Sequence, residues 1–223
     1  MHYEGKQVQP PLKIPIQLQQ LAQLAQQPQK PPESVYINFS AEVNPSTTEA
    51  LIAAVGNAVN QGVKKMCLML STPGGQVMNG LNLYNVLRGL PIELTTHNVG
   101  NVDSIGNTVF MAGSKRYACP HSTFMFHGVA ASVQATLAAP TGPMAILGEK
   151  ELRERLGAIQ ADQKRIGSVI RERTRLGEPD IETLFLEAQT KDANWALSCG
   201  VIDEIRDVQV PAGIPVISLV FQR

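Results

Sequence analysis

The chain has 223 residues, enough for one sizeable core with appendages, and 19 basic residues balance 19 acidic ones to a formal charge of zero. That balance argues against nucleic acid or an anionic membrane as the main partner, because both need a clustered basic excess. No apolar run approaches membrane-spanning length and the N-terminus lacks a basic-then-apolar signal pattern, so we expect a cytoplasmic protein without a membrane anchor.

Residues 1–33 differ in composition from the rest of the chain. Glutamine recurs there and six prolines interrupt any regular element. Such a segment buries too little apolar surface to order itself, so we predict a flexible N-terminal arm. Because residues 12–18 alternate like a strand, ordering of part of the arm against a partner or a neighbouring subunit is the second interpretation.

The domain is expected to begin with a strand at residues 35–39. Ser46 and Glu49 have the spacing of a capping box ahead of a helix that ends near Gly62. Residues 66–70 then form a continuous apolar run, which is typical of a strand buried on both faces. The order strand, helix, strand predicts an α/β fold with a parallel sheet.

Two glycine turns follow neighbouring strands. The buried strand at residues 66–70 ends in Ser71-Thr-Pro-Gly-Gly75, and a second strand at residues 92–99 also ends in a glycine turn and a short helix. In a parallel sheet both turns lie at the carboxyl edge, where open α/β sheets bind ligands. Gly74 and Gly75 there present bare backbone N–H groups, although a plain turn explains Pro-Gly-Gly equally well on its own.

Ser104 stands where the second strand turns into a short apolar helix over residues 105–112. A hydroxyl at such a turn points out of the sheet while the first helical N–H groups face a developing negative charge. Asp103 and Ser104 are also ordinary helix N-cap residues, so capping is the competing interpretation. His127 ends a later strand-like run and is followed by glycine, which lets its imidazole reach the same edge.

The C-terminal half carries a long amphipathic helix over residues 144–176, whose stripe consists of Leu152, Leu156, Ile159, Gln163, Ile166 and Ile170. At about 1.5 Å per residue this helix reaches beyond a compact domain and suggests an interface with another subunit. Asp192 stands before a further short helix, where N-capping is at least as good an interpretation as catalysis. We place the α/β domain at residues 34–207 and a tail or strand at residues 208–223.

Several segments together resemble the proteolytic subunit of the caseinolytic (Clp) protease, within the ClpP/crotonase-like superfamily. The resemblance covers roughly residues 35–205 and is carried by these segments in this order: Ser71-Thr-Pro-Gly-Gly75, Asn101-Val-Asp-Ser-Ile-Gly106, Met111-Ala-Gly-Ser-Lys-Arg-Tyr117, His127, the long helix and Gly200-Val-Ile-Asp203. It implies a spiral of βαβ units with a protruding handle helix that joins subunits into rings.

The same resemblance implies a serine peptidase with a Ser-His-Asp site. Ser104 matches the nucleophile and His127 the general base. The backbone N–H groups of Gly75 and Ile105 match the oxyanion hole, with Gly74 allowing the turn. A serine hydroxyl needs an imidazole to take its proton, and the tetrahedral oxyanion needs donors already in position.

The sequence departs from the family pattern at several places. Asp103 replaces a small apolar residue, His127-Gly-Val replaces His-Gln-Pro, and residues 130–142 match the family's glycine-rich strand poorly. For the triad acid, an alignment without gaps gives Ala188, whereas a shortened segment brings Asp192 onto the family's basic-residue-Asp pair. We nominate Asp192, with Glu187 as an alternative.

We therefore expect a Clp-type serine endopeptidase that acts on peptides or unfolded proteins in a homo-oligomeric ring, with an AAA+ unfoldase as a further partner. No phosphate-binding Gly-x-x-x-x-Gly-Lys loop is present, so ATP hydrolysis would belong to that partner. The alternatives are a crotonase-like acyl-thioester enzyme and a scaffold subunit whose triad has decayed. We expect no cofactor and no metal, since the three cysteines lie far apart and form no zinc motif.

Overall fold

The computed structural model describes residues 32–130 and 143–221, and its core is a sheet of eight strands. Six strands follow the order β6-β5-β3-β2-β1-β8, while β4 pairs with β3 and β7 pairs with β4. Every pair is parallel except β5 with β6. The strands are β1 (Ser34–Ser40), β2 (Lys65–Thr72), β3 (Glu93–Asp103), β4 (Lys115–Ala118), β5 (Thr123–Met125), β6 (Thr190–Asp192), β7 (Glu204–Ile205) and β8 (Val216–Leu219).

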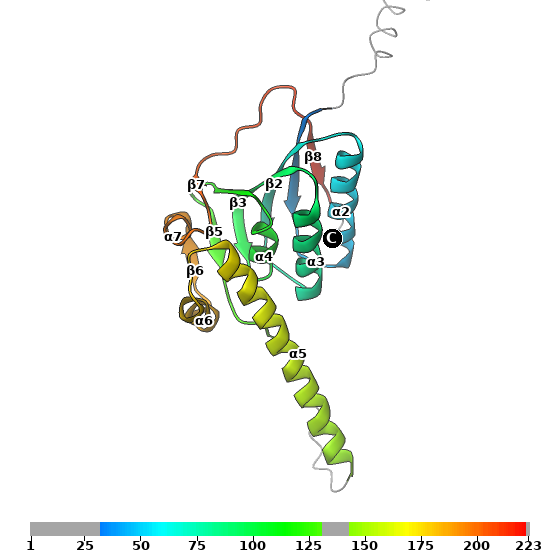
Figure 1. Ribbon diagram of the computed structural model, residues 1–223, viewed down its shortest axis with the longest axis vertical. Helices are drawn as coiled ribbons and strands as arrows, with labels where there is room; N and C mark the ends of the chain where they lie inside the picture. The colour runs from blue at the N-terminus through cyan, green and yellow to red at the C-terminus, as the bar shows by residue number, and fades with distance from the viewer. Residues whose placement is uncertain (1–31, 131–142, 222–223) are drawn as a thin grey trace, which may run out of the picture. The chain divides into compact units, whose positions relative to one another are not determined.

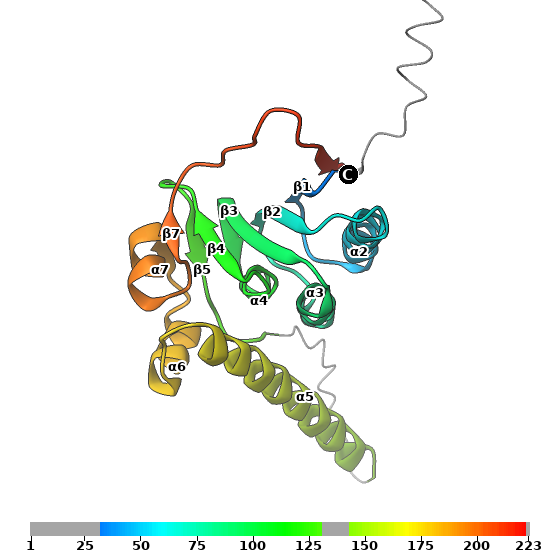
Figure 2. The ribbon, with the colours of Figure 1, turned by 45° about the horizontal axis from the view of Figure 1, so that its top comes forward.

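Helices α2, α3 and α4 lie along one face of this sheet, and α6 and α7 lie beside the β5–β6 edge (Figure 2). The described helices are α2 (Pro45–Asn60), α3 (Val77–Gly89), α4 (Gly106–Phe110), α5 (Pro143–Arg173), α6 (Glu178–Glu187) and α7 (Ala193–Cys199). The order strand, helix, strand and the parallel pairing of β2 with β3 confirm the predicted α/β class.

Helix α2 begins earlier than its predicted capping box. Asn44 is the N-cap residue: its side chain accepts a hydrogen bond from the Thr47 N–H, and the Thr47 hydroxyl accepts one from the Asn44 N–H, each at 3.0 Å. Pro45 fits the first helical position because the N–H that proline lacks has no intrahelical partner there. The prediction that Ser46 and Glu49 form the box is therefore wrong.

Strand β2 is less enclosed than its apolar run predicts. Met66, Leu68 and Leu70 are buried, but Cys67 and Met69 between them are only half-buried. One face of the sheet is covered by helices, whereas the segment between β7 and β8 crosses over the other face (Figure 2). The prediction of a strand buried on both faces is wrong for this reason.

The C-terminal segment adds β8 beside β1, in parallel pairing from Tyr36 with Val216 to Phe39 with Leu219. Most of the predicted arm at residues 1–33 and most of the segment at residues 130–142 lie outside the described residues. Within the described ranges, no helix combines the length and apolar character needed to cross a bilayer.

Helix α5 has 31 residues, which gives a length of about 46 Å, and its N-terminal part extends away from the sheet (Figure 1). Its C-terminal part is anchored by Ile166, Val169 and Ile170, which are buried. The Arg173 guanidinium also donates hydrogen bonds to the carbonyl oxygens of Met111 and Gly113, just after α4. Helix α5 is thereby fixed at one end to the elements around Ser104.

Candidate active site

Ser104 lies between the end of β3 and the start of α4, in a left-handed conformation with φ of +55°. Few residues other than glycine adopt this conformation, and it is commonly held in place by surrounding structure at functional sites. The N-cap residue of α4 is Ile105, without a side-chain cap, and the described residues give the Ser104 hydroxyl no hydrogen-bond partner. The capping interpretation of Ser104 is therefore wrong.

Asp103 is no cap either, because its carboxylate is held by a side chain of the same strand. The Asn101 amide donates to Asp103 Oδ2 at 2.6 Å and to the Thr72 carbonyl oxygen at 3.2 Å. These bonds join the ends of β2 and β3, and they give the extra negative charge beside Ser104 a fixed partner.

The glycine turn after β2 lies directly against Ser104. Gly74 has φ of +90°, and a Cβ atom there would lie 2.6 Å from the Ser104 Cβ. The Gly74 N–H donates to the Thr72 hydroxyl at 3.1 Å, so Gly74 shapes the turn instead of offering a donor. The N–H groups of Gly75 and Ile105 have no acceptor among the described residues and remain open to an oxyanion.

Ser104 and His127 line one small cavity of about 50 Å³, whose wall also includes Ile105 and Phe185. Both side chains are half-buried. No hydrogen bond joins them within the described chain, and catalytic hydrogen bonds are often long until substrate binds. The structure thus brings the predicted serine and histidine to one space, from beyond the carboxyl ends of the paired parallel strands β3 and β5.

His127 makes its hydrogen bond with a backbone group. Its Nδ1 lies 2.6 Å from the carbonyl oxygen of Gly128. A carbonyl only accepts, so Nδ1 carries the proton and Nε2 is left with a free lone pair. This is the tautomer that a general base requires.

Neither candidate for the triad acid pairs with His127. The Asp192 carboxylate is the N-cap of α7 and accepts from the Trp195 N–H at 2.8 Å. Glu187 pairs with Lys191 at 3.3 Å. In the antiparallel ladder Asp192 lies opposite Thr123, four residues before His127, and the ladder ends at Met125 opposite Thr190. Ala188, which the alignment without gaps gives, has a methyl group that cannot accept a hydrogen bond.

Two residues that sequence reasoning left without a role support the site. The buried Asn107 amide donates to the carbonyl oxygens of Ser104 at 3.1 Å and Met125 at 2.8 Å, which ties the serine turn to β5. Gln163 accepts from the Val129 N–H at 3.2 Å through Oε1. Asn107 was visible in the sequence as an amide within a short apolar helix, and Gln163 as the one amide in the apolar stripe of the long helix.

The model of the Clp protease family matches residues 29–209. The chain belongs to the Clp protease family. This membership agrees with the fold and is the family to which the resemblance pointed.

Curated relatives support the same assignment at low identity. Proteolytic subunit 2 of the ATP-dependent Clp protease of Chlamydia abortus is 26% identical over 175 residues, which cover 76% of this chain and 78% of that protein. Proteolytic subunit 1 of Chlamydia felis is 28% identical over 147 residues, or 64% of this chain and 65% of that protein. Proteolytic subunit 1 of Corynebacterium jeikeium is 34% identical over 77 residues, or 34% of this chain and 41% of that protein.

Proposed function

We propose that this Clp-family protein hydrolyses peptide bonds with Ser104 as nucleophile and His127 as general base. The Ser104 hydroxyl attacks the scissile carbonyl carbon while Nε2 of His127 takes the hydroxyl proton. The C–N bond then breaks, and the imidazolium returns that proton to the leaving amine. Water, activated by the same imidazole, hydrolyses the acyl-enzyme and releases the second product.

The N–H groups of Gly75 and Ile105 would stabilise the tetrahedral oxyanion. Both lack an acceptor among the described residues, and both flank Ser104, one from the glycine turn and one from the following residue. Removing one such donor typically costs about 100- to 1000-fold in turnover.

The observation that carries this proposal is the shared cavity of Ser104 and His127. Family membership alone permits a scaffold whose site has decayed. Such a scaffold has no need to keep a serine hydroxyl free of hydrogen bonds, or a histidine in the tautomer whose Nε2 lone pair is open.

We also propose that the protein works as a homo-oligomeric ring in which α5 contacts neighbouring subunits. Leu152 and Leu156 on α5 are 44% and 54% exposed, and they continue the stripe that Ile166 and Ile170 bury against the sheet. Analytical ultracentrifugation should show an oligomer that Leu156→Glu dissociates, with Glu151→Gln on the same helix as the control. An oligomer of unchanged size in Leu156→Glu would remove α5 from the interface.

The substrates proposed are peptides and unfolded chains, with an AAA+ unfoldase as the partner that delivers folded ones. The relatives are named as subunits of an ATP-dependent protease, which supports an ATP-driven partner for this chain. Neither substrate sequence nor partner is needed for the first test, because a ring peptidase accepts short peptides that diffuse in.

The test is hydrolysis of a fluorogenic peptide library by the purified oligomer, by Ser104→Ala and by Ser198→Ala. Ser198 is exposed on α7 and bonds the Trp195 carbonyl oxygen, so it controls for loss of a serine elsewhere. We expect cleavage by the wild type and by Ser198→Ala but not by Ser104→Ala. Intact oligomer without cleavage would favour a decayed scaffold, and coenzyme A raising the melting temperature would favour a crotonase-like enzyme.

A further inference from the structure

We propose that Gln163 is a positioning residue that holds and polarises the peptide group to which His127 is hydrogen-bonded. The inference rests on the proposed function, since it gives His127 the orienting partner that a general base needs. In Clp-type sites the resemblance assigns that task to an aspartate, and the described chain has no carboxylate paired with His127.

A continuous chain of hydrogen bonds connects Gln163 with the imidazole. His127 Nδ1–H donates to the Gly128 carbonyl oxygen at 2.6 Å, and the N–H of that same peptide group, on Val129, donates to Gln163 Oε1 at 3.2 Å. Each bond in such a chain polarises the next, so a good acceptor for the Val129 N–H makes the Gly128 oxygen a better acceptor for Nδ1–H. The result is an imidazole held in one tautomer and made more basic at Nε2.

Two helices hold Gly128 and Val129, one through each of two successive peptide groups. The Gly128 N–H donates to the Phe185 carbonyl oxygen on α6 at 3.1 Å, while Gln163 reaches Val129 from α5. A Cβ atom at Gly128 would lie 2.9 Å from Gln163 Oε1, so a side chain there would displace the Gln163 amide. The donor exists because residue 129 is not proline, which has no N–H.

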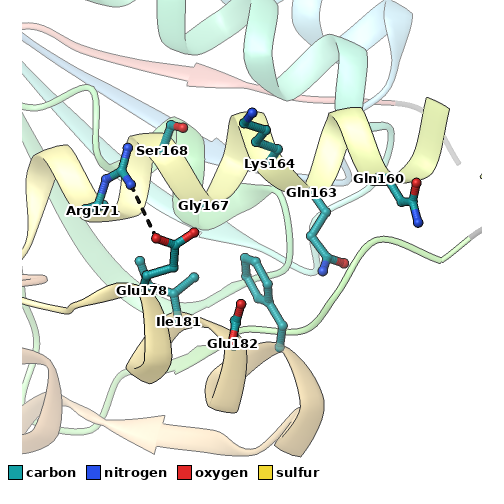
Figure 3. Close-up of a pocket in the computed structure, with 10 residues that line it drawn as sticks. Gln160, Gln163, Lys164, Gly167, Ser168, Arg171, Glu178, Ile181 and Glu182 are labelled. Atoms are coloured by element: carbon teal, nitrogen blue, oxygen red, sulfur yellow. Dashed lines mark ion pairs between the residues drawn. The ribbon is translucent and has the colours of Figure 1, made fainter. Parts of the chain in front are cut away.

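Gln163 lies on the wall of a larger cavity of about 260 Å³ between α5 and α6 (Figure 3). Gln160 lines the same cavity one turn earlier, is exposed, and makes no hydrogen bond within the described residues. The chain therefore offers a matched control: the same side chain, on the same helix and in the same cavity, without the contact to Val129.

Charged groups on the surrounding elements have partners of their own or lie in solvent. They are Asp103 at the end of β3, Lys164 on α5, Glu182 and Glu187 on α6, and Asp192 at the end of β6. Asp103 bonds Asn101, Glu187 pairs with Lys191, Asp192 caps α7, and Lys164 and Glu182 are exposed. Within the described chain none forms an ion pair with His127, so the bond to Gly128 is its fixed polar contact.

The experiment compares Gln163→Met, Gln163→Glu, Val129→Pro and the control Gln160→Met in the intact oligomer. Two quantities are measured for each: the pH profile of peptide hydrolysis, and the pKa and tautomer of His127 by NMR of 15N-histidine-labelled protein. The signal of His127 is assigned with His127→Gln. The NMR measurement needs no catalysis, so it tests the effect of Gln163 on His127 even if the protein shows no peptidase activity.

We expect Gln163→Met to lower kcat about tenfold with little change in KM, a part of the roughly 100- to 10,000-fold that a general base contributes. The acidic limb of its profile should move to lower pH. Gln163→Glu keeps an acceptor and adds a negative charge that favours the imidazolium, so kcat should recover and the limb should move to higher pH. Gln160→Met should match the wild type in kcat and in the pH of the acidic limb.

Val129→Pro removes the N–H that donates to Gln163 Oε1. It should change kcat and the pH profile in the same way as Gln163→Met, although it leaves α5 unaltered. Combining the two should cost no more than either alone, because both break one interaction. The inference is overturned if the pKa and tautomer of His127 are the same in Gln163→Met, Gln163→Glu and wild type. It is also overturned if Gln163→Glu loses as much activity as Gln163→Met with no shift of the profile, because Gln163 would then serve packing alone.

Discussion

The backbone N–H of Ser104 donates to the carbonyl oxygen of Met125 at 2.8 Å, two residues before His127. This bond fixes Ser104, the proposed nucleophile, to the strand that leads to His127, the proposed base, and the Asn107 amide reinforces it by donating to the carbonyl oxygens of both Ser104 and Met125. The separation of Ser104 and His127 is therefore set by contacts at the ends of β3 and β5 and not by a bond between the two side chains.

Asn107→Ala should weaken both the fold and the site. Asn107 is 1% exposed, so the two carbonyl oxygens lose a donor where water cannot easily replace it. Each oxygen keeps one backbone donor, so the expected cost is that of two lost hydrogen bonds, about 0.5–1.5 kcal/mol of unfolding free energy for each. Urea unfolding measures the loss, and Asn57→Ala on the exposed side of α2 is the control. A variant as stable and as active as the wild type would show that the bridge is dispensable.

Gly74→Ala should lower turnover while leaving the protein folded. The new methyl group would lie 2.6 Å from the Ser104 Cβ in a backbone conformation of φ +90° that alanine rarely adopts, so the serine or the turn must move. Gly56→Ala is the matched control, because nothing lies within 4 Å of its added Cβ and α2 gains a better helix former. Peptide hydrolysis and thermal unfolding of both variants separate the two effects, and full activity in Gly74→Ala would contradict the placement of Ser104.

Asp192→Ala should reduce stability by about 1 kcal/mol, the usual cost of losing an N-cap, and Asp192→Asn should restore it because asparagine caps equally well. Neither change should alter kcat much, since the carboxylate contacts the Trp195 N–H. Unfolding free energies and kcat of the two variants test this. A large loss of kcat in Asp192→Asn with stability intact would instead make Asp192 the triad acid, reached after a rearrangement on substrate binding.

His97 should make stability depend on pH. Burial lowers the pKa of this imidazole, and its Nε2–H donates to the Arg206 carbonyl oxygen at 2.9 Å. The unfolded chain then binds more protons than the folded one, so the stabilisation is present above the unfolded pKa of about 6.5 and is lost as pH falls towards the lowered folded pKa.

The expected result is a melting temperature that falls between about pH 7 and pH 5, with a smaller fall in His97→Gln. His121→Gln, at an exposed residue, should follow the wild type. If the melting temperature falls equally steeply with pH in all three proteins, His97 does not cause the pH dependence of stability.

The periodic elements were predictable because local chemistry determines them. The strand at residues 35–39, the buried run at residues 66–70 and the helix ending before Gly62 all follow from the spacing of apolar residues. The start of α2 was misplaced because Asn44, Pro45 and Ser46 all have residue types favoured at helix starts, and only the packing of the turn selects among them.

The meeting of the candidate site residues at one edge of the sheet was predictable, but their contacts were not. The glycine turn, Ser104 and His127 are visible as turn-forming residues after strands, so their convergence follows once the sheet is parallel. Local sequence does not predict the left-handed backbone of Ser104 or the hydrogen bond between Val129 and Gln163, because both depend on segments far apart in the chain. The N-cap role of Asp192 was predictable because it is local: its carboxylate accepts from the Trp195 N–H three residues further on.

The most direct test of the account is the site of covalent labelling by a fluorophosphonate probe on the assembled protein. Peptide mapping by mass spectrometry should find the adduct on Ser104, at a rate that falls strongly in His127→Gln and stays unchanged in His121→Gln. Assembled protein that carries no adduct on Ser104, or that labels equally fast without the His127 imidazole, would contradict the claim that these two side chains form a working nucleophile and base.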